Sequence, residues 1–162
     1  MRDGCSCSVL HHAASSGNVE SIKTVLAFFP ESQWLNMVSM SGGNDTVLHK
    51  AADSRDTESI KFLLSLYPES QRLQAVCMQT TRNGLTVLHY VVHSRNLQPM
   101  ICILSLLPES QRLQALNVPD HNRHTVLTLV AQRLNKDPND TSFDSILSLL
   151  SWSQHARARR MC

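Results

Sequence analysis

The chain has 162 residues, of which 42% are hydrophobic, enough to build one domain around a continuous core. Its formal net charge of +2 offers no strong field that would favour nucleic acid or a membrane surface. Five cysteines, an odd number at scattered positions, indicate free thiols in a reducing, cytoplasmic compartment. There is no apolar run of ~20 residues and none before Cys5, so we expect neither a membrane span nor a secretory signal peptide.

A four-residue motif recurs along the chain at a nearly constant interval. It reads Ser-Val-Leu-His at 8–11, Thr-Val-Leu-His at 46–49 and 86–89, and Thr-Val-Leu-Thr at 125–128. The motif leucines are separated by 38, 40 and 39 residues. A fixed period of this size predicts an array of stacked structural units.

Each unit predicts three helices in the same order, as the second one illustrates. Thr46 can cap a first, short helix, in which the small side chain of Ala51 permits close packing. After a polar break, apolar residues at helical spacing, among them Ile60 and Leu64, predict a second helix. The proline of Pro68-Glu69 ends that helix and suits the first turn of a third, whose dipole favours the glutamate.

The fourth unit departs most from the others. Thr128 replaces the motif histidine, and a polar insertion at 135–141 precedes a last helix at about 142–153. Terminal repeats are expected to be atypical because one face meets water. We place the repeats at about 3–40, 41–80, 81–120 and 121–153, followed by a basic tail at 154–162.

This pattern resembles the ankyrin repeat. The matching residues are Asn83-Gly84-Leu85-Thr86-Val87-Leu88-His89 and the segment 17–26, which has the family's Gly-x-x-x-x-Ile/Val-x-x-Val/Leu-Leu character. The resemblance covers about residues 3–153 and implies an all-α, ankyrin-like helical solenoid of about four repeats with lengthened inter-repeat segments. Valine replaces the family's motif proline in every copy.

The glycine between the first two helices of the family survives only as Gly17, because Arg55 and Arg95 occupy that position in later repeats. In a left-handed conformation each arginine would cost on the order of 1 kcal/mol. The motif histidines, in contrast, match the family, and the resemblance implies that their rings tie neighbouring repeats together through hydrogen bonds to the backbone or the threonine hydroxyl: His11, His49 and His89.

A narrower resemblance concerns the Thr-Val-Leu-His and Glu-Ser-Gln-Arg-Leu-Gln-Ala segments. They look like those of ankyrin effectors that intracellular bacterial pathogens deliver into host cells, which implies virulence and a host-cell protein as the partner. Delivery signals of that class are often C-terminal and rich in Glu, whereas the tail of this chain is basic. The alternative is that the chain is an ankyrin targeting segment of a larger, enzyme-containing protein.

Chemistry-bearing motifs are sparse. Cys5 and Cys7 with His11 and His12 form the only cluster with metal-ligand spacing, and structural zinc sites usually pair two such clusters. The sequence has no nucleophile–base set, phosphate loop or His-Glu-x-x-His motif. We therefore expect no enzyme activity, no metal and no cofactor.

The resemblance implies protein–protein recognition through a concave surface of turn and first-helix residues. The family's contact positions at the turns are Asp45, Arg82, Asn83, Leu85, His121, Asn122 and His124. Those at the first-helix ends are Asp53, Ser54, His93, Ser94, Gln132 and Arg133. Leu85 is a candidate apolar anchor, whereas Arg82, His93 and Arg133 suit an acidic partner.

Overall fold

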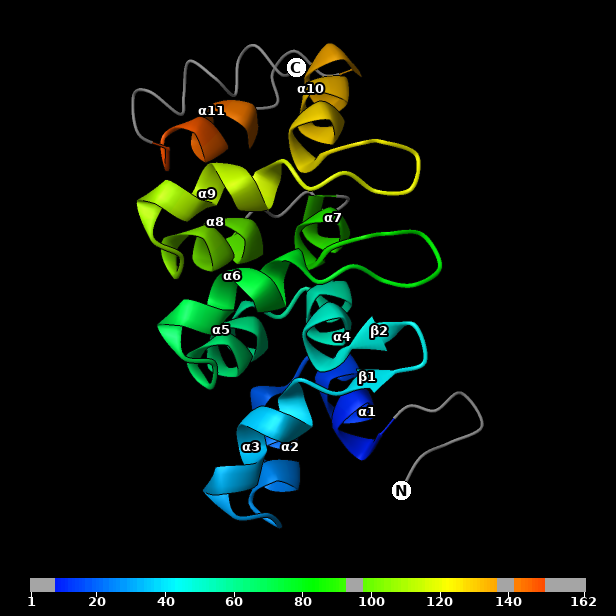
Figure 1. Ribbon diagram of the computed structural model, residues 1–162, viewed down its shortest axis with the longest axis vertical. Coiled ribbons are helices and arrows are strands. Elements are labelled where there is room, and N and C mark those ends of the chain that lie inside the picture. The colour runs from blue at the N-terminus through cyan, green and yellow to red at the C-terminus, as the bar shows by residue number, and fades with distance from the viewer. Residues whose placement is uncertain (1–7, 93–97, 137–141, 151–162) are drawn as a thin grey trace.

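The computed structural model describes residues 8–92, 98–136 and 142–150. Within these ranges the chain forms helices and a single two-stranded antiparallel hairpin (Figure 1). The first repeat contains α1 (Val9–Ser15), α2 (Val19–Leu26) and α3 (Glu31–Val38). The second contains β1 (Ser41–Gly42), β2 (Asp45–Thr46), α4 (Val47–Ser54), α5 (Thr57–Ser65) and α6 (Glu69–Cys77). The remaining helices are α7 (Val87–Val92), α8 (Gln98–Ser105), α9 (Glu109–Leu116), α10 (Val126–Lys136) and α11 (Ser142–Leu147).

The helices stack as a solenoid. α1, α4, α7 and α10 form one column, each packing on the next, and the second and third helices form the layer beside it (Figure 1). The β1–β2 hairpin and the corresponding turns before α7 and α10 project from the opposite side of the first-helix column (Figure 1). The prediction of an all-α, ankyrin-like solenoid with lengthened inter-repeat segments is therefore confirmed.

Local sequence sets the helix boundaries. The side chains of Asn18 and Asp56 cap α2 and α5 by accepting hydrogen bonds from main-chain N–H groups of the first turn. Each third helix follows a proline, as predicted, although Pro68 lies at the N-cap of α6 and not in its first turn. Its extended backbone, with φ −53° and ψ 145°, suits the residue that precedes a helix.

The hydrophobic core lies between the column of first helices and the layer of second and third helices. Leu48, Leu88, Ile60 and Leu64 are fully buried, and Ala51 and Ala52 are buried where first helices approach closely. The predicted inward-facing residues of the third helices behave in the same way, since Val76, Leu113 and Leu116 are buried and Leu73 is half-buried. The last predicted helix is present as α11, which ends at Leu147.

The third helices also link repeats through side-chain donors. Arg112 of α9 donates from Nε to the carbonyls of Leu104 and Leu107 at 2.8 and 3.2 Å, at the end of α8. Its Nη1 donates to Leu149 O of the next repeat at 2.7 Å. Arg72 of α6 makes the same two kinds of contact, to Tyr67 O at 3.2 Å and to Leu106 O at 3.5 Å. These guanidinium groups donate to carbonyls at or near helix ends, where the intrahelical donors run out.

Arg55 ends α4 in the left-handed conformation, with φ 62°, as Gly17 does after α1 with φ 65°. The sequence comparison of the repeats anticipated this strain at Arg55, whereas Arg95 lies outside the described residues. Arg123, in the turn before α10, has φ 66°. An L-residue in this region suffers a close contact between Cβ and the following carbonyl oxygen, which glycine lacks.

Replacing Arg55 by Gly is expected to raise the free energy of unfolding by about 0.5–1 kcal/mol, because relief of the left-handed strain exceeds the added entropy of the unfolded chain. Urea denaturation measures the change. Arg82→Gly is the matched control, since Arg82 is exposed and its φ is not positive, so this substitution should not stabilise the protein. A midpoint for Arg55→Gly at or below the wild-type value contradicts the strain.

Candidate recognition surface

The motif histidines connect successive repeats, as predicted. His49 Nδ1 lies 2.8 Å from Thr46 Oγ1 and accepts from Thr46 N at 3.3 Å, while Nε2 lies 3.1 Å from Leu85 O of the next repeat. A main-chain N–H only donates and a carbonyl only accepts, so Nδ1 is the acceptor and Nε2 carries the proton. His89 repeats the arrangement with Thr86 and with His124 O at 3.1 Å. His11 does so with Ser8 and with Asp45 O at 3.3 Å.

Burial favours the neutral form of two of these rings, those of His11 and His49. Desolvation is the largest influence on the pKa of His49 and lowers it below 6.5, outweighing the hydrogen bond to Leu85 O, which raises it. The pKa of His11 is lowered for the same reason. A neutral ring is what the geometry needs, because protonation of Nδ1 would set an N–H against the N–H of Thr46.

Thr128 replaces the histidine in the fourth repeat and keeps only the local half of the arrangement. Its Oγ1 accepts from Thr125 N at 2.8 Å and donates to Thr125 O at 2.8 Å. Thr128 N donates to Thr125 Oγ1 at 3.2 Å, which caps α10. The short threonine side chain therefore ends the series of inter-repeat ring bonds within the described residues.

The turns stack on one another beside the first helices. Thr81 Oγ1 lies 2.6 Å from Asn44 Oδ1, and His121 N donates to Asn83 O at 3.0 Å. Gly84 has φ 68°, and a Cβ there would lie 2.9 Å from the main-chain nitrogen of His121 and would also meet its ring. Glycine at this position thus permits both the left-handed turn and the close approach of the next turn.

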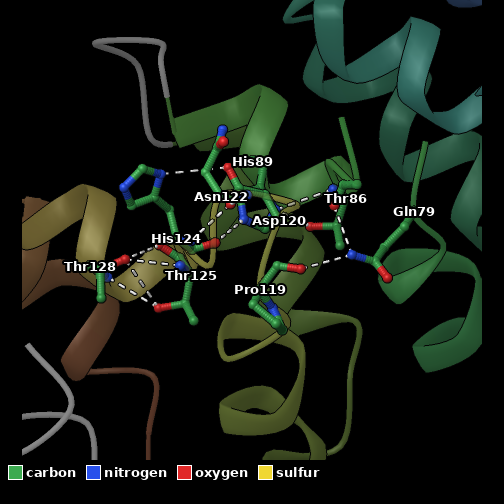
Figure 2. A network of polar contacts seen from close by, with 10 residues as sticks. Gln79, Thr86, His89, Pro119, Asp120, Asn122, His124, Thr125 and Thr128 are labelled. Carbon is green, nitrogen blue, oxygen red and sulfur yellow. Dashed lines mark hydrogen bonds and ion pairs between the residues drawn. The ribbon is translucent and has the colours of Figure 1, made fainter. Parts of the chain in front are cut away.

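Two residues that the sequence analysis did not single out organise the turns, as Figure 2 shows. Asp120 Oδ1 accepts from Asn122 N and His124 N, both at 2.8 Å, and its side chain is only 7% exposed. Gln79 Nε2 donates to Gly84 O and to Pro119 O, each at 2.8 Å, joining two turns. The motif of the ankyrin family begins with an Asp at the position of Asp120, and this match could have identified Asp120 from the sequence.

A polar cluster lies on the first-helix column between the second and third repeats. Lys50 Nζ pairs with Asp45 Oδ2 at 2.6 Å, and the Tyr90 hydroxyl donates to Asp45 Oδ1 at 2.9 Å. Burial of Asp45 acts to raise its pKa, but the bonds from Lys50 and Tyr90 outweigh it and hold the pKa below 3.8. The Tyr90 ring packs edge-on against His49, with centroids 5.5 Å apart. Burial, together with Asp45, raises the pKa of Tyr90.

The predicted contact residues fall into three groups by their placement. Exposed side chains at the turns or first-helix ends are Arg82, Asn83, His121, Asn122, Asp53 and Gln132. Half-buried residues that also bond within the fold are Asp45, Ser54, Leu85, His124 and Arg133. His93 and Ser94 lie outside the described residues.

Leu85 lies directly before Thr86 and not at the tip of its turn. Its main-chain N–H donates to Thr80 Oγ1 at 3.0 Å and its carbonyl accepts from Thr80 N and His49 Nε2. Arg133 donates from Nη1 to Val92 O at 2.7 Å, at the end of α7. Arg133 also lines a shallow hollow of about 120 Å³ between α7 and α10, with Val92, Leu129, Gln132 and Lys136.

The structure offers little that resembles a catalytic or metal centre. Among the described residues no three His, Cys, Asp or Glu side chains gather closely enough to hold a metal ion. Cys5 and Cys7 lie outside that part of the chain. Burial raises the pKa of the Cys77 thiol to about 11 and also raises that of Cys102, so neither is a reactive thiolate. In the same described ranges, every helix is too short or too polar for a transmembrane segment.

Stacked helical units of this kind define a class of repeat proteins that present a surface along the array. In a comparison with known families, residues 10–64 match the family model described as ankyrin repeats (many copies). A search of curated proteins found no match. Ankyrin repeats are generally non-catalytic modules that bind other proteins.

Proposed function

We propose that this chain binds a partner protein through the recognition surface formed by its projecting turns and first-helix ends, without catalysis. One observation supports this most directly: the bonds that join repeats use main-chain carbonyls of Asp45, Leu85 and His124, whose side chains differ from repeat to repeat. The histidine bonds therefore place no demand on these side chains, and the exposed turn residues Arg82, Asn83 and His121 are available for a partner. A rigid array needs little reordering on binding, which favours affinity.

The exposed cations of neighbouring turns, Arg82 and Arg123, lie beside His121 and suit an acidic partner surface. On the same surface, Asp53 of α4 exposes a negatively charged carboxylate. The carboxylate of Asp45 is already paired with Lys50. We therefore propose that the turns of the third and fourth repeats meet the acidic part of the partner. His93, Ser94 and Arg133 would extend this contact along the first helices.

We further propose that the partner is a host-cell protein and that the chain acts as a bacterial effector in the host cytoplasm. The support is the resemblance of the repeated Thr-Val-Leu-His and Glu-Ser-Gln-Arg segments to such effectors. The half-buried free thiols of Cys77 and Cys102 suit a reducing compartment. The competing proposal, a targeting segment of a larger enzyme, would be favoured if the flanking reading frame encoded a catalytic domain in the same polypeptide.

The triple variant Arg82→Ala, Asn83→Ala, His121→Ala tests the surface in capture of partners from host-cell lysate, identified by mass spectrometry. These side chains are exposed, so the melting temperature should stay near the wild-type value. Each hot-spot residue contributes roughly 2 kcal/mol, or about thirtyfold in Kd, so capture should be lost.

Lys23→Ala with Lys61→Ala is the matched control, because both lysines lie on second helices away from the turns. Lys23 pairs with Glu20 at 2.7 Å on that exposed surface, an ion pair of small energetic weight. This variant should capture the partner as the wild type does. If the lysine pair abolishes capture and the turn variant does not, the proposed recognition surface is wrong even though the fold stands.

A further inference from the structure

The turn before α7 contains Asn83 followed by Gly84, which is the only Asn-Gly pair in the sequence. The turn projects from the first-helix column (Figure 1), and Asn83 is exposed on it. Within the described part of the chain, no hydrogen bond holds the side-chain amide of Asn83 in place. The amide can therefore rotate towards the main-chain nitrogen of Gly84, the residue that follows.

An asparagine followed by a glycine is chemically vulnerable for a steric reason. The main-chain nitrogen of the following residue can attack the carbon of the asparagine side-chain amide, and a side chain on the following residue obstructs that attack. Glycine has no Cβ and leaves the approach open. Asparagine is for this reason counted among the thermolabile residues of proteins.

The fold requires glycine at position 84. Gly84 has φ 68°, a left-handed conformation that glycine adopts without strain. A Cβ there would lie 2.9 Å from the main-chain nitrogen of His121 and would also meet the His121 ring. The close packing of two turns therefore keeps an unobstructed main-chain nitrogen next to Asn83.

The next turn provides an internal comparison. Asn122 occupies the same position as Asn83, three residues before the motif threonine, and is also exposed. Arg123 follows it with φ 66°, close to the φ of Gly84. The main-chain nitrogen of each following residue donates to a carbonyl of its own turn at 3.0 Å. The two asparagines thus share a similar setting, and the side chain of Arg123 is the difference that bears on the attack.

We propose that Asn83 is a site of deamidation in the folded protein. Gly84 N forms a bond to Asn83 Cγ, the bond from Cγ to the side-chain nitrogen breaks, and that nitrogen leaves as ammonia with the proton of Gly84 N. Water then adds to one of the two carbonyl carbons of the succinimide ring, the bond from that carbon to Gly84 N breaks, and Gly84 N takes a proton from the water. Attack at Cγ gives aspartate, and attack at the main-chain carbon gives isoaspartate. Water is the only co-reactant, and an amide becomes a carboxylate.

The product changes the turn in charge and in shape. A carboxylate at position 83 lies next to Arg82, so an acidic partner should bind less tightly. Isoaspartate also adds a carbon to the main chain before Gly84, where His121 N donates to Asn83 O and a Cβ has no room. The effect on partner binding rests on the function proposed above, whereas the chemical change does not.

Incubation of the folded protein at physiological temperature, in mildly alkaline buffer made with water enriched in a heavy oxygen isotope, tests the proposal. Peptide mapping by mass spectrometry should find residue 83 converted to aspartate and isoaspartate, which separate by chromatography and each carry the isotope. Asn122 should convert at least about tenfold more slowly, because Arg123 obstructs the attack that Gly84 permits. Circular dichroism checks that the protein stays folded throughout.

Asn83→Gln is the matched variant, because it keeps the amide on a longer side chain that would have to close a larger ring. Residue 83 of this variant should stay unconverted. A sample unfolded in urea gives the rate without the fold, and the folded rate should be lower but measurable, since Gly84 N is bonded to Thr80 O.

Conversion of Asn83 in urea alone would overturn the proposal, because it would show that the fold prevents the reaction. Equal rates at Asn83 and Asn122 would also overturn it, since Gly84 would then not be the cause. These measurements use no partner, so their outcome is separate from that of the partner-capture experiment.

Discussion

His49→Ala is expected to lower the free energy of unfolding by about 1–3 kcal/mol, because it leaves Leu85 O and the Thr46 N–H without their ring partner in a buried place. His49 is fully buried, so truncation also opens a cavity between the second and third repeats. His89→Ala should lose a similar amount, since its ring makes the same bonds to Thr86 and His124 O. Urea denaturation measures both changes.

His49→Thr is the matched control, because Thr128 shows which bonds a threonine makes at the position of the motif histidine. In the fourth repeat the threonine keeps the local bonds to Thr125 and makes none to a following carbonyl. His49→Thr should therefore retain the local helix start and lose mainly the bond to Leu85 O, at about 1 kcal/mol. Wild-type stability in His49→Ala would refute the structural role of the motif histidines.

Arg112→Met is expected to lower the free energy of unfolding by about 2–3 kcal/mol, since hydrogen bonds from a charged donor contribute more than neutral ones. The substitution removes the side-chain donor from the carbonyls of Leu104, Leu107 and Leu149, of which Leu104 O also accepts from Leu107 N. Methionine retains much of the apolar stem, so the measured loss reports the guanidinium and not the packing. Hydrogen exchange should show the largest change around Leu149, in the turn after α11, which Arg112 ties to α9.

Arg72→Met is the matched control for the same position one repeat earlier. The bonds of Arg72 to Tyr67 O and Leu106 O are longer, at 3.2 and 3.5 Å, so its replacement should cost less than that of Arg112. Equal losses for the two variants, or no loss for Arg112→Met, would show that these arginines contribute through their stems alone.

The fold follows from the sequence wherever the repeats agree with each other. The recurring motif, the Pro-Glu start of each third helix and the apolar spacing of each second helix predicted α3, α5 and α6, and the resemblance to the ankyrin repeat implied the His49 linkage. These features depend on residues close together within one repeat, or on a motif whose structural role is known from the family it resembles. Arg55 was anticipated in the same way, because it occupies the position of Gly17.

Contacts between repeats were harder to predict from the sequence. Arg72 and Arg112 look like exposed residues of a polar helix, and their acceptors Leu106 O and Leu149 O lie 34 and 37 residues away. The Tyr90–Asp45 bond spans 45 residues. Every residue carries a main-chain carbonyl, so the sequence does not show which carbonyls accept the bonds from Arg72 and Arg112. The exposure of Phe29 was equally hidden, since its position is apolar in every repeat and only stacking order distinguishes it.

The use of main-chain carbonyls by the histidine linkages has a consequence for how this protein can change. The acceptors of His11, His49 and His89 belong to an aspartate, a leucine and a histidine, and the ring bond has the same form in all three. The ring bond itself is therefore independent of side-chain identity at those positions, although the Asp45 carboxylate makes a separate bond to Tyr90 of the next repeat. Substitution of exposed turn residues such as Arg82 or His121 can therefore change which partner is bound while the histidine bonds between repeats persist.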